Sequence, residues 1–369
     1  MKRYNNIYNK ITDINVILNM YNTIYKNIRN KNKLYEFDKL LSINLINIKE
    51  KLITNTYIPG EYNIFLIHEP KVRIIMSQNI EDKIINHLVA KYLLIDIFDK
   101  TLINENCATR INKGTHYALN LFKKYYNKYK NKYEKFYILK FDISKYFYNI
   151  DHDIVKELIS NRIKDKKALN ILFKIIDSTD EEYVNKKVLE LKQKEINRIN
   201  KLNISDKEKL KKIEEIKSIP NIKKGKSMSI GNMVSQVIAT FYLNELDHHI
   251  KEKLNKHYIR YQDDGVLFSN NKEYLKYCLK EIEIILNKYK LKLNNKTKIY
   301  NNKEGISFLG FRFFIKNNKT IIKISNKTKK NFKKKLKTKN INIISSYIGH
   351  LKYGTCNNLI YKGVHNEKI

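Results

Sequence analysis

The sequence contains no tryptophan, and its 369 residues include only three prolines, ten glycines and three cysteines. With so little proline and glycine, no flexible linker divides the chain, and no internal repeat of about 20–50 residues is visible. The cysteines are far apart, odd in number and form no CxxC pair; they are Cys107, Cys278 and Cys356. A disulfide framework and a cysteine-based zinc site are therefore both disfavoured.

Long apolar runs are also missing. A transmembrane helix needs about 18 consecutive apolar residues, and the best stretch, Leu88–Phe98, is interrupted by Lys91 and Asp96. The N-terminal segment MKRYNNIYNK lacks the apolar core of a secretory signal. These absences predict a cytoplasmic protein without a membrane partner.

Acidic residues are scarce relative to basic ones. The chain has 73 Lys+Arg and 37 Asp+Glu, a formal net charge of +36. Such a surplus favours nucleic acid as the partner, with a membrane surface or an acidic protein as alternatives. An AT-rich genome would also raise the lysine count, but residues 316–340 hold eleven lysines and no acid. A solvated helix face usually mixes both signs, so this segment favours nucleic acid.

The hydrophobic content of 42% is enough to form real cores, and its periodicity predicts helices and strands in alternation. Helices are predicted at 11–56, 80–99, 152–177, 234–254 and 273–289, with a charged helical hairpin at 180–219 and a helical basic tail from 316. Strands are predicted at 62–67, 71–76, 136–144, 257–261, 266–269, 298–301 and 306–315. In the hairpin, Ser205 and Glu208 form a predicted capping box. This order predicts an α+β fold with an antiparallel sheet.

Two adjacent carboxylates, Asp263 and Asp264, lie in the run HYIRYQDDGVLFS. The apolar segments on either side predict a hairpin with its turn at QDDG. Like charges a few ångströms apart are unfavourable unless a cation lies between them, and Mg²⁺ prefers carboxylate oxygens. The alternative is that Asp-Asp-Gly is simply a polar turn.

Asp142 ends the apolar run FYILKFD, which places it at the end of a predicted strand. An aspartate after a strand is often a helix cap, and this alternative remains open for Asp142 alone. Together with Asp263 and Asp264 it would supply three carboxylates on adjacent strand ends. That arrangement suits a two-metal site, in which one ion lowers the pKa of an attacking hydroxyl and the other neutralises a leaving pyrophosphate.

Three runs resemble the palm motifs of reverse transcriptases, in the same order along the chain. They are FDISKYFYNIDHDI at Asp142, SIGNMVSQVIATFYLNELD at 229–247, and YQDD at 261–264, which matches the YxDD signature of that family. The resemblance implies a right-hand polymerase fold. It also implies two Mg²⁺ ions, with Mn²⁺ as the alternative, and a metal-binding set of Asp142, Ile143, Asp263 and Asp264.

The same resemblance divides the chain into segments. Residues 1–135 are expected to form an N-terminal helical region and the fingers. The palm is expected at 136–179 and 223–315, and a basic helical thumb at 316–369. Residues 180–222 are a charged helical insert, which is either a solvated hairpin or a docking surface for RNA or a partner.

Further blocks resemble the nucleotide-binding parts of the family. KVRIIMSQNIEDKIINHLV opens with Lys71 and Arg73, which would bind the triphosphate of a deoxynucleotide; surface ion pairing is the alternative for both. Phe147 lies where an aromatic ring excludes a 2′-OH, unless it is an ordinary core residue. Gly231 and Gln236 complete the expected deoxynucleotide-binding set, although a glutamine inside a helix is often inert.

Two blocks near the C-terminus resemble catalytic and primer-binding elements. LKLNNKTKIY contains Lys296, the implied catalytic lysine near the leaving group, and ISFLGFRF resembles the primer-grip hairpin. The expected primer and template contacts are Ser235, Tyr261, Phe308, Leu309 and Gly310. The implied substrates are a template RNA, its RNA/cDNA duplex and deoxynucleoside triphosphates.

The run IGNMVSQ at 230–236 has the IGNxxSQ form of diversity-generating retroelement enzymes, and the blocks at 107–122 and 345–355 also resemble that group. The resemblance implies a bacterial or phage enzyme that copies a template RNA with errors at adenines, together with a small basic accessory protein. Ile230 would lie in the pocket linked to this infidelity, and Gln262 is polar where the group usually has an apolar residue. The alternatives are a defence-associated or retron-type enzyme in antiphage immunity, and a non-catalytic RNA-binding scaffold.

Overall fold

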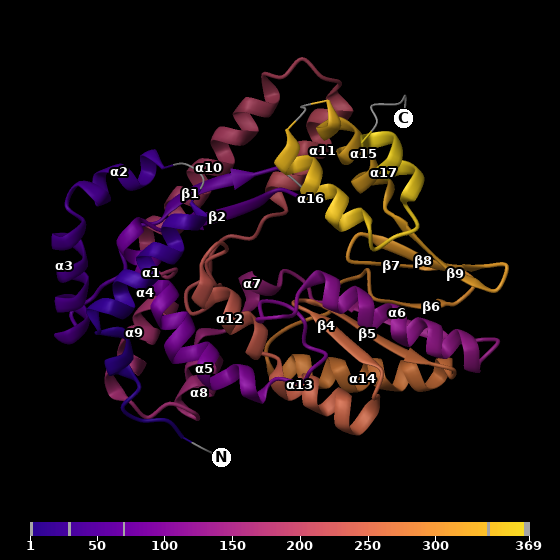
Figure 1. The fold of residues 1–369 in the computed structure, drawn as a ribbon, viewed down its shortest axis with the longest axis horizontal. Coiled ribbons are helices and arrows are strands. Elements are labelled where there is room, and N and C mark those ends of the chain that lie inside the picture. The colour runs from indigo at the N-terminus through magenta and orange to yellow at the C-terminus, as the bar shows by residue number, and fades with distance from the viewer. Residues whose placement is uncertain (1–2, 29–30, 69–70, 338–339, 365–369) are drawn as a thin grey trace. The chain divides into compact units, whose positions relative to one another are not determined.

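The computed structural model describes residues 3–28, 31–68, 71–337 and 340–364 (Figure 1). The chain is a mixture of helices and antiparallel sheets, which confirms the predicted α+β fold class and agrees with a right-hand polymerase fold. It forms two compact units. Unit 1 comprises Met1–Leu102, Lys145–Glu245 and Asn287–Leu291, and unit 2 comprises Ile103–Ser144, Leu246–Leu286 and Lys292–Ile369.

Unit 1 is mainly helical. Its helical elements are η1 (Tyr8–Ile11), α1 (Ile14–Asn27), α2 (Asn32–Lys39), α3 (Leu41–Ile53), α4 (Ile80–Leu88), the π-helical η2 (Val89–Ile95), α5 (Asp96–Phe98), η3 (Asp99–Thr101), α7 (Tyr146–Asn149), α8 (His152–Ser160), α9 (Lys166–Asp177), α10 (Glu182–Asn200), α11 (Asp206–Lys217) and α12 (Met233–Phe241).

Several long helices expected from the sequence are divided in unit 1. The predicted helix at 152–177 is split into α8 and α9, because Asp165 caps the start of α9 by accepting the backbone N–H groups of Lys167 and Ala168. The predicted helical region at 11–56 contains three helices, α1–α3, and η1 ends at its first residue, Ile11. Apolar periodicity locates helical faces, whereas a polar cap inside a periodic run ends a helix without changing that pattern.

Strands β1 (Asn63–Ile67) and β2 (Arg73–Ser77) form an antiparallel pair in which Asn63 lies opposite Ser77. This confirms the predicted strand pair. The charged hairpin is also confirmed: it consists of α10 and α11, and the Ser205 hydroxyl accepts the backbone N–H of Glu208. The hairpin shares a core with β1 and β2 made by Tyr62, Ile74, Met76, Val184, Val188, Ile219 and Ile222. The predicted insert is therefore packed against the strand pair at its base.

The main sheet of unit 2 has the strand order β4-β5-β3-β6, and its neighbouring strands are antiparallel. Its strands are β3 (Tyr137–Asp142), β4 (Tyr258–Tyr261), β5 (Asp264–Ser269) and β6 (Lys298–Asn301). Helix α6 (Thr115–Lys132) lies along one face of β4 and β5, and α14 (Lys272–Lys288) lies along the other (Figure 1). Helix α6 was not predicted, although its buried residues recur at helical spacing.

A second sheet in unit 2 consists of β7 (Ile306–Phe308), β8 (Phe311–Lys316) and β9 (Lys319–Ile324). The predicted strand 306–315 is divided by a turn at Leu309–Gly310, and the tail predicted as helical begins instead with β9. The β-branched run in this strand, with Ile322 and Ile324 buried, favours a strand over a helix. Helices α15 (Asn326–Leu336), α16 (Ile341–Leu351) and α17 (Asn357–Val364) follow. Residues 338–339 and 365–369 of the predicted thumb lie outside the described residues.

The helical run predicted at 234–254 is also divided, into α12, α13 (Asn244–His248) and the π-helical η4 (His249–Leu254).

The three cysteines are buried and free, and burial raises the pKa of the Cys107 thiol to about 12. Within the described ranges, no helix has both the length and the apolar content needed to cross a bilayer. The boundaries of the five predicted segments remain predictions; these segments are 1–135, 136–179, 180–222, 223–315 and 316–369.

Removal of the Asp165 carboxylate should destabilise unit 1 more than removal of an exposed cap. The side chain of Asp165 accepts the Tyr8 backbone N–H at 3.0 Å in addition to capping α9. We expect Asp165→Ala to lower the free energy of unfolding by about 2–3 kcal/mol. The control Asp13→Ala removes only the exposed cap of α1 and should cost about 1 kcal/mol. Urea denaturation measures both, and equal losses would contradict a second role for Asp165.

Candidate active site

The adjacent carboxylates lie at the tip of the hairpin formed by β4 and β5. Tyr261 pairs with Asp264, so the turn consists of Gln262 and Asp263 alone. This corrects the predicted QDDG turn, because Asp264 and Gly265 already belong to β5. Gln262 has a φ of 55°, the left-handed conformation that tight hairpin turns require.

Asp142 lies directly opposite Asp264 at the end of β3. Directly opposed residues of an antiparallel pair project from the same face of the sheet, so these two side chains are cross-strand neighbours. Asp263 is tied to the same strand end, because its carbonyl accepts the backbone N–H of Ile143 at 3.2 Å. The structure thus brings Asp142, Asp263 and Asp264 to one edge of the sheet, and all three are partly exposed.

The donor set at this edge suits hard divalent cations. Carboxylate oxygens are the ligands that Mg²⁺ prefers. The side chain of Ile143 is buried, so any contribution from this residue comes from its backbone. Lys140 Nζ lies 3.7 Å from Asp264 Oδ1 and 3.3 Å from the Ser307 carbonyl, which adds one positive charge beside the carboxylates.

The loop that carries Lys296 is attached to the end of β3. The carbonyl of Asp142 accepts the Asn294 backbone N–H at 2.7 Å, and the Asp142 backbone N–H donates to Thr297 Oγ1 at 3.4 Å. Lys296 itself is exposed. The structure therefore places the loop of Lys296 beside the predicted metal ligands, as a catalytic role near the leaving group requires.

Gly265 has a packing role that the sequence did not reveal. It lies opposite Phe141 in the β3–β5 register, and a Cβ atom at Gly265 would be only 2.1 Å from Phe141 Cζ. The ring of Phe141 therefore occupies the space above this glycine. Glycine follows the two aspartates because any side chain at position 265 would collide with this ring; turn geometry is not the reason.

A buried ion pair supports the hairpin from within unit 2. Arg260 Nε lies 2.7 Å from Asp247 Oδ1 and Nη2 lies 2.8 Å from Oδ2, and both side chains are fully buried. The third guanidinium nitrogen, Nη1, donates to the carbonyl of Gln262 at 2.9 Å. Tyr258 and Asn106 also donate to the Asp247 carboxylate. Arg260 therefore positions the turn that carries Asp263.

Sequence reasoning missed Arg260 and Asp247. One signal was present: an arginine within the otherwise apolar and aromatic strand HYIRY needs a buried acid, and Asp247 ends the helical run NELD. The alternation of the strand explains the arrangement. Arg260 lies opposite Gly265, so it projects from the face of the sheet opposite to that of Asp142 and Asp264.

The segment before α6 also holds the hairpin. The backbone N–H of Cys107 donates to the Arg260 carbonyl at 3.0 Å. Gln262 Nε2 donates to Thr109 Oγ1 at 2.8 Å, and the Tyr261 hydroxyl lies 3.1 Å from Thr115 Oγ1. The polar side chain at position 262 thus has a structural partner in the block that precedes α6.

The other expected primer and template residues lie in different environments. Phe308 is fully buried in the core of unit 2. Leu309 and Gly310 form the β7–β8 turn with φ values of 45° and 86°, and Gly310 is exposed. Ser235, in unit 1, is buried, and its hydroxyl is 2.9 Å from that of Ser229. Of these residues, the hydroxyl of Ser235 and the ring of Phe308 are not available at the surface of their units.

Unit 1 brings most of the expected nucleotide-binding residues into one region. The backbone N–H of Met76, in the strand of Arg73, donates to the Ile230 carbonyl at 3.0 Å. Gly231 has a φ of 122°, and a Cβ atom there would lie 3.2 Å from Ile75 Cγ2. This combination of conformation and close approach to β2 favours glycine at position 231.

Phe147 lies beside the same region. Its carbonyl accepts the Met228 backbone N–H at 2.8 Å, two residues before Ile230, and its ring is partly exposed. The hydroxyl of the neighbouring Tyr148 is hydrogen-bonded to the backbone of Ile74. Burial raises the pKa of this hydroxyl to about 12, so it stays protonated. A partly exposed ring is compatible with contact to a substrate.

Lys71 and Arg73 are exposed, and among the described residues neither forms an ion pair. Gln236 is half-buried on α12, one turn after the start of that helix. Its backbone N–H donates to the Asn232 carbonyl at 3.2 Å, as expected for the first turn of a helix.

Breaking the buried Arg260–Asp247 pair should lower the free energy of unfolding far more than breaking an exposed ion pair. We expect Arg260→Met to lower the free energy of unfolding by about 3–5 kcal/mol, because the Asp247 carboxylate stays buried without its partner. The double variant Arg260→Met/Asp247→Leu should recover most of this loss. The exposed pair Lys288–Glu245 provides the control, and Lys288→Met should cost less than about 1 kcal/mol.

Urea denaturation measures these changes in the free energy of unfolding. Hydrogen exchange measures the protection of the backbone amides in the β4–β5 hairpin. The double variant should still exchange faster at the hairpin than the parent protein, because the Gln262 carbonyl has lost its donor. Full protection of the hairpin in the double variant would contradict the positioning role of Arg260.

A methyl group at position 265 should disturb the sheet. We expect Gly265→Ala to destabilise the protein by about 1–3 kcal/mol, because the ring of Phe141 must move. Phe141→Leu in the same chain should relieve part of the strain. The control Gly349→Ala, in α16, meets no atom within 4 Å and should be neutral or slightly stabilising. Thermal or urea denaturation of the four proteins tests this, and a neutral Gly265→Ala would contradict the packing role.

Comparisons with known proteins find similar structures and a matching family model. The solved structures that are similar to the chain include two of apo telomerase from Candida tropicalis, each with 15% identity and a TM-score of 0.41. The similarity to the first covers 70% of this chain and 47% of the telomerase chain. For the second, which is truncated from the C-terminal domain, the shares are 72% and 55%.

The chain thus spans about half the length of those telomerase chains. No curated protein has significant sequence similarity to it. The family model described as "Reverse transcriptase (RNA-dependent DNA polymerase)" matches residues 67–313, which is more than half of the chain. This protein therefore belongs to the reverse transcriptase family.

Proposed function

We propose that the protein is an RNA-directed DNA polymerase that copies a template RNA into cDNA. The observation that carries the proposal is the in-register pairing of Asp142 with Asp264, with Asp263 bonded to Ile143 at the same strand end. Such carboxylates at one sheet edge suit phosphoryl transfer, in which catalysis depends on positioning and on stabilisation of negative charge.

Reverse transcriptase domains generally use divalent metals. We propose two Mg²⁺ ions, with Mn²⁺ as the alternative, bound by Asp142, Asp263, Asp264 and the backbone of Ile143. When bound, the ions would activate the attacking 3′-hydroxyl and neutralise the leaving pyrophosphate. Lys296, on the loop bonded to Asp142, would supply positive charge and a proton to the leaving group.

The deoxynucleoside triphosphate would contact residues of unit 1. Lys71 and Arg73 are exposed cations that would bind the phosphate oxygens. The partly exposed ring of Phe147 would exclude a 2′-hydroxyl. Gly231 would let the backbone approach the base, and Gln236, half-buried on α12, would offer its amide to the substrate.

The charge of the chain supports nucleic acid as the macromolecular partner. A net charge of +36 would favour binding to the template RNA and to the RNA/cDNA duplex. The last turn of helix α15 contains Lys333, Lys334 and Lys335, in the segment assigned to a basic thumb. We infer that these lysines contact the duplex backbone, which positions the duplex without reading its sequence. The exposed turn at Gly310 would contact the primer.

For the biological role we propose targeted mutagenesis by a diversity-generating retroelement, with a small basic accessory protein as partner. Support comes from the IGNMVSQ run and from the contact of Ile230 and Gly231 with the strand of Arg73. A residue at this position would influence how the incoming nucleotide is held. The second candidate role is antiphage defence with the same chemistry.

Primer extension tests the proposed activity. Purified protein would receive an RNA template, a DNA primer, deoxynucleotides and Mg²⁺, and the products would be sequenced. We expect Asp264→Asn to reduce incorporation at least about a thousandfold, because it removes a charged metal ligand worth several kcal/mol. The control Asp206→Asn changes an exposed acid on α11 and should leave the rate unchanged.

The result separates the candidate functions. Errors concentrated opposite template adenines would support diversification, and uniform errors would favour the defence role. Tight RNA binding without incorporation, with the accessory protein present, would support the scaffold alternative and contradict the polymerase. Equal rates in Asp264→Asn and the parent protein would overturn the assignment of this carboxylate.

A further inference from the structure

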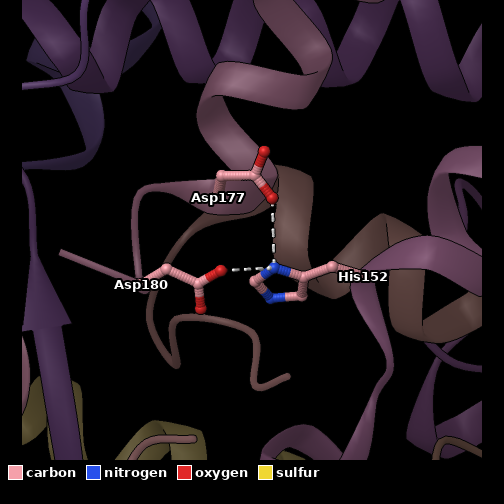
Figure 2. Close-up of side chains that lie close together, drawn as sticks. All are labelled: His152, Asp177 and Asp180. Atoms are coloured by element: carbon pink, nitrogen blue, oxygen red, sulfur yellow. Dashed lines mark hydrogen bonds and ion pairs between the residues drawn. The ribbon is translucent and has the colours of Figure 1, made fainter. Parts of the chain in front are cut away.

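His152, Asp177 and Asp180 form a second polar cluster, within unit 1. His152 is the first residue of α8, Asp177 is the last of α9, and Asp180 lies in the loop that follows. His152 Nδ1 lies 3.2 Å from Asp177 Oδ1 and 3.4 Å from Asp180 Oδ2. Figure 2 shows the ring nitrogen facing both carboxylates. Of the described residues, these three offer ligand atoms within 4.8 Å of one another.

The other ring nitrogen determines which atom carries the proton. His152 Nε2 lies 2.8 Å from the Ser227 carbonyl, and a carbonyl oxygen only accepts, so Nε2 carries a hydrogen and donates it. In the neutral ring, the lone pair of Nδ1 then points towards two carboxylate oxygens. These groups repel one another unless a cation, either a proton or a metal ion, lies between them.

The distances fit a metal ion as well as a proton, because His152 Nδ1 and Asp177 Oδ1, 3.2 Å apart, are within hydrogen-bond reach. A charged N–H group and a carboxylate normally lie about 2.7–2.9 Å apart, which is shorter than both distances from Nδ1. Nitrogen and oxygen ligands lie about 2.0–2.2 Å from zinc, so two ligands of a tetrahedral ion are about 3.4 Å apart. The separations of 3.2 and 3.4 Å from Nδ1 are close to two edges of such a tetrahedron, and all three ligand atoms lie within 4.8 Å of one another.

We propose that His152, Asp177 and Asp180 bind a zinc-like divalent ion. An imidazole with two carboxylates suits zinc better than Mg²⁺ or Ca²⁺, which prefer oxygen ligands alone. The side chain of His152 is 1% exposed, whereas that of Asp177 is 43% exposed. The open side at Asp177 leaves the fourth position to water. This site differs in ligand type from the all-carboxylate set of Asp142, Asp263 and Asp264.

The surroundings hold the ligands in place. The Ser227 carbonyl orients the imidazole, as partners of the second ring nitrogen do in metal sites. It also accepts the Thr179 hydroxyl at 2.9 Å. The backbone N–H of Gly225 donates to both oxygens of Asp180 at 3.0 Å. Lys156 Nζ lies 2.7 Å from Asp177, so its ammonium group competes with a metal ion for that carboxylate.

Metal binding would join three parts of unit 1. The ligands come from the start of α8, the end of α9 and the loop before α10, and Ser227 belongs to the segment that continues to Ile230 and Gly231. The ion would therefore order the base of the α10–α11 hairpin and the segment that contacts β2. Its role is structural, and it does not depend on the proposed polymerase activity.

Titration with Co²⁺ and Zn²⁺ tests the proposal directly. The full-length, tag-free protein would carry Asp142→Asn, Asp263→Asn and Asp264→Asn, so that those carboxylates contribute no binding. We expect one equivalent of Co²⁺ to produce visible absorption of a tetrahedral nitrogen–oxygen site, and Zn²⁺ to displace it and raise Tm. His152→Gln and Asp180→Asn should each weaken binding at least about a hundredfold. The control Asp153→Asn, an exposed neighbour on α8, should bind normally.

A fourth variant distinguishes a metal site from a purely structural cluster. Removing the competing ammonium with Lys156→Gln should tighten Zn²⁺ binding about tenfold. If instead a proton joins His152 to the carboxylates, Lys156→Gln would lower stability and bind no zinc. Should His152→Gln fail to fold, the partly exposed Asp177→Asn replaces it and should also lose the ion. Absence of Co²⁺ absorption from both the parent and Lys156→Gln would overturn the proposal, as would unchanged binding in Asp177→Asn and Asp180→Asn.

Discussion

The register between β3 and β5 decides where the carboxylates of the candidate active site lie. Asp142 opposes Asp264 only in this register, because a slip by one residue would reverse the face of every side chain in the slipped strand. The contact of the Phe141 ring with Gly265 specifies the register, since any other residue at 265 would collide with the ring. Packing on one face of the sheet thus aligns acidic groups on the other.

The two faces of this sheet hold charged side chains in different environments, one partly exposed and the other buried. On one face, the carboxylates of Asp142 and Asp264 are partly exposed, where cations and water can reach them. On the opposite face, Arg260 and Asp247 are fully buried, and their mutual hydrogen bonds offset the cost of removing both charges from water. Because Arg260 also donates to the Gln262 carbonyl, the buried pair holds the turn that presents Asp263. Rigidity on the inner face therefore supports the placement of charge on the outer one.

Local patterns in the sequence predicted much of this fold and failed at identifiable places. The strand pair, the β4–β5 hairpin and the cap at Ser205 follow from alternation and from turn and cap residues a few positions apart. The helix at 152–177 was too long because Asp165 interrupts it with a cap. The tail from 316 is predicted as helical, whereas residues 319–324 form β9, in which the buried Ile322 and Ile324 lie opposite Phe313 and Phe311 of β8.

The sequence alone determined the chemistry that is present: three aspartates at predicted strand ends, the order of the family motifs and a strongly basic chain. Tertiary structure decided which residues meet. Asp247 and Arg260 are joined across two elements, Gly265 is required by a ring on another strand, and His152 faces carboxylates 25 and 28 positions away. The physical reason is range: propensity, capping and alternation act over a few residues, while packing and charge pairing depend on distances that exist only after the chain has folded.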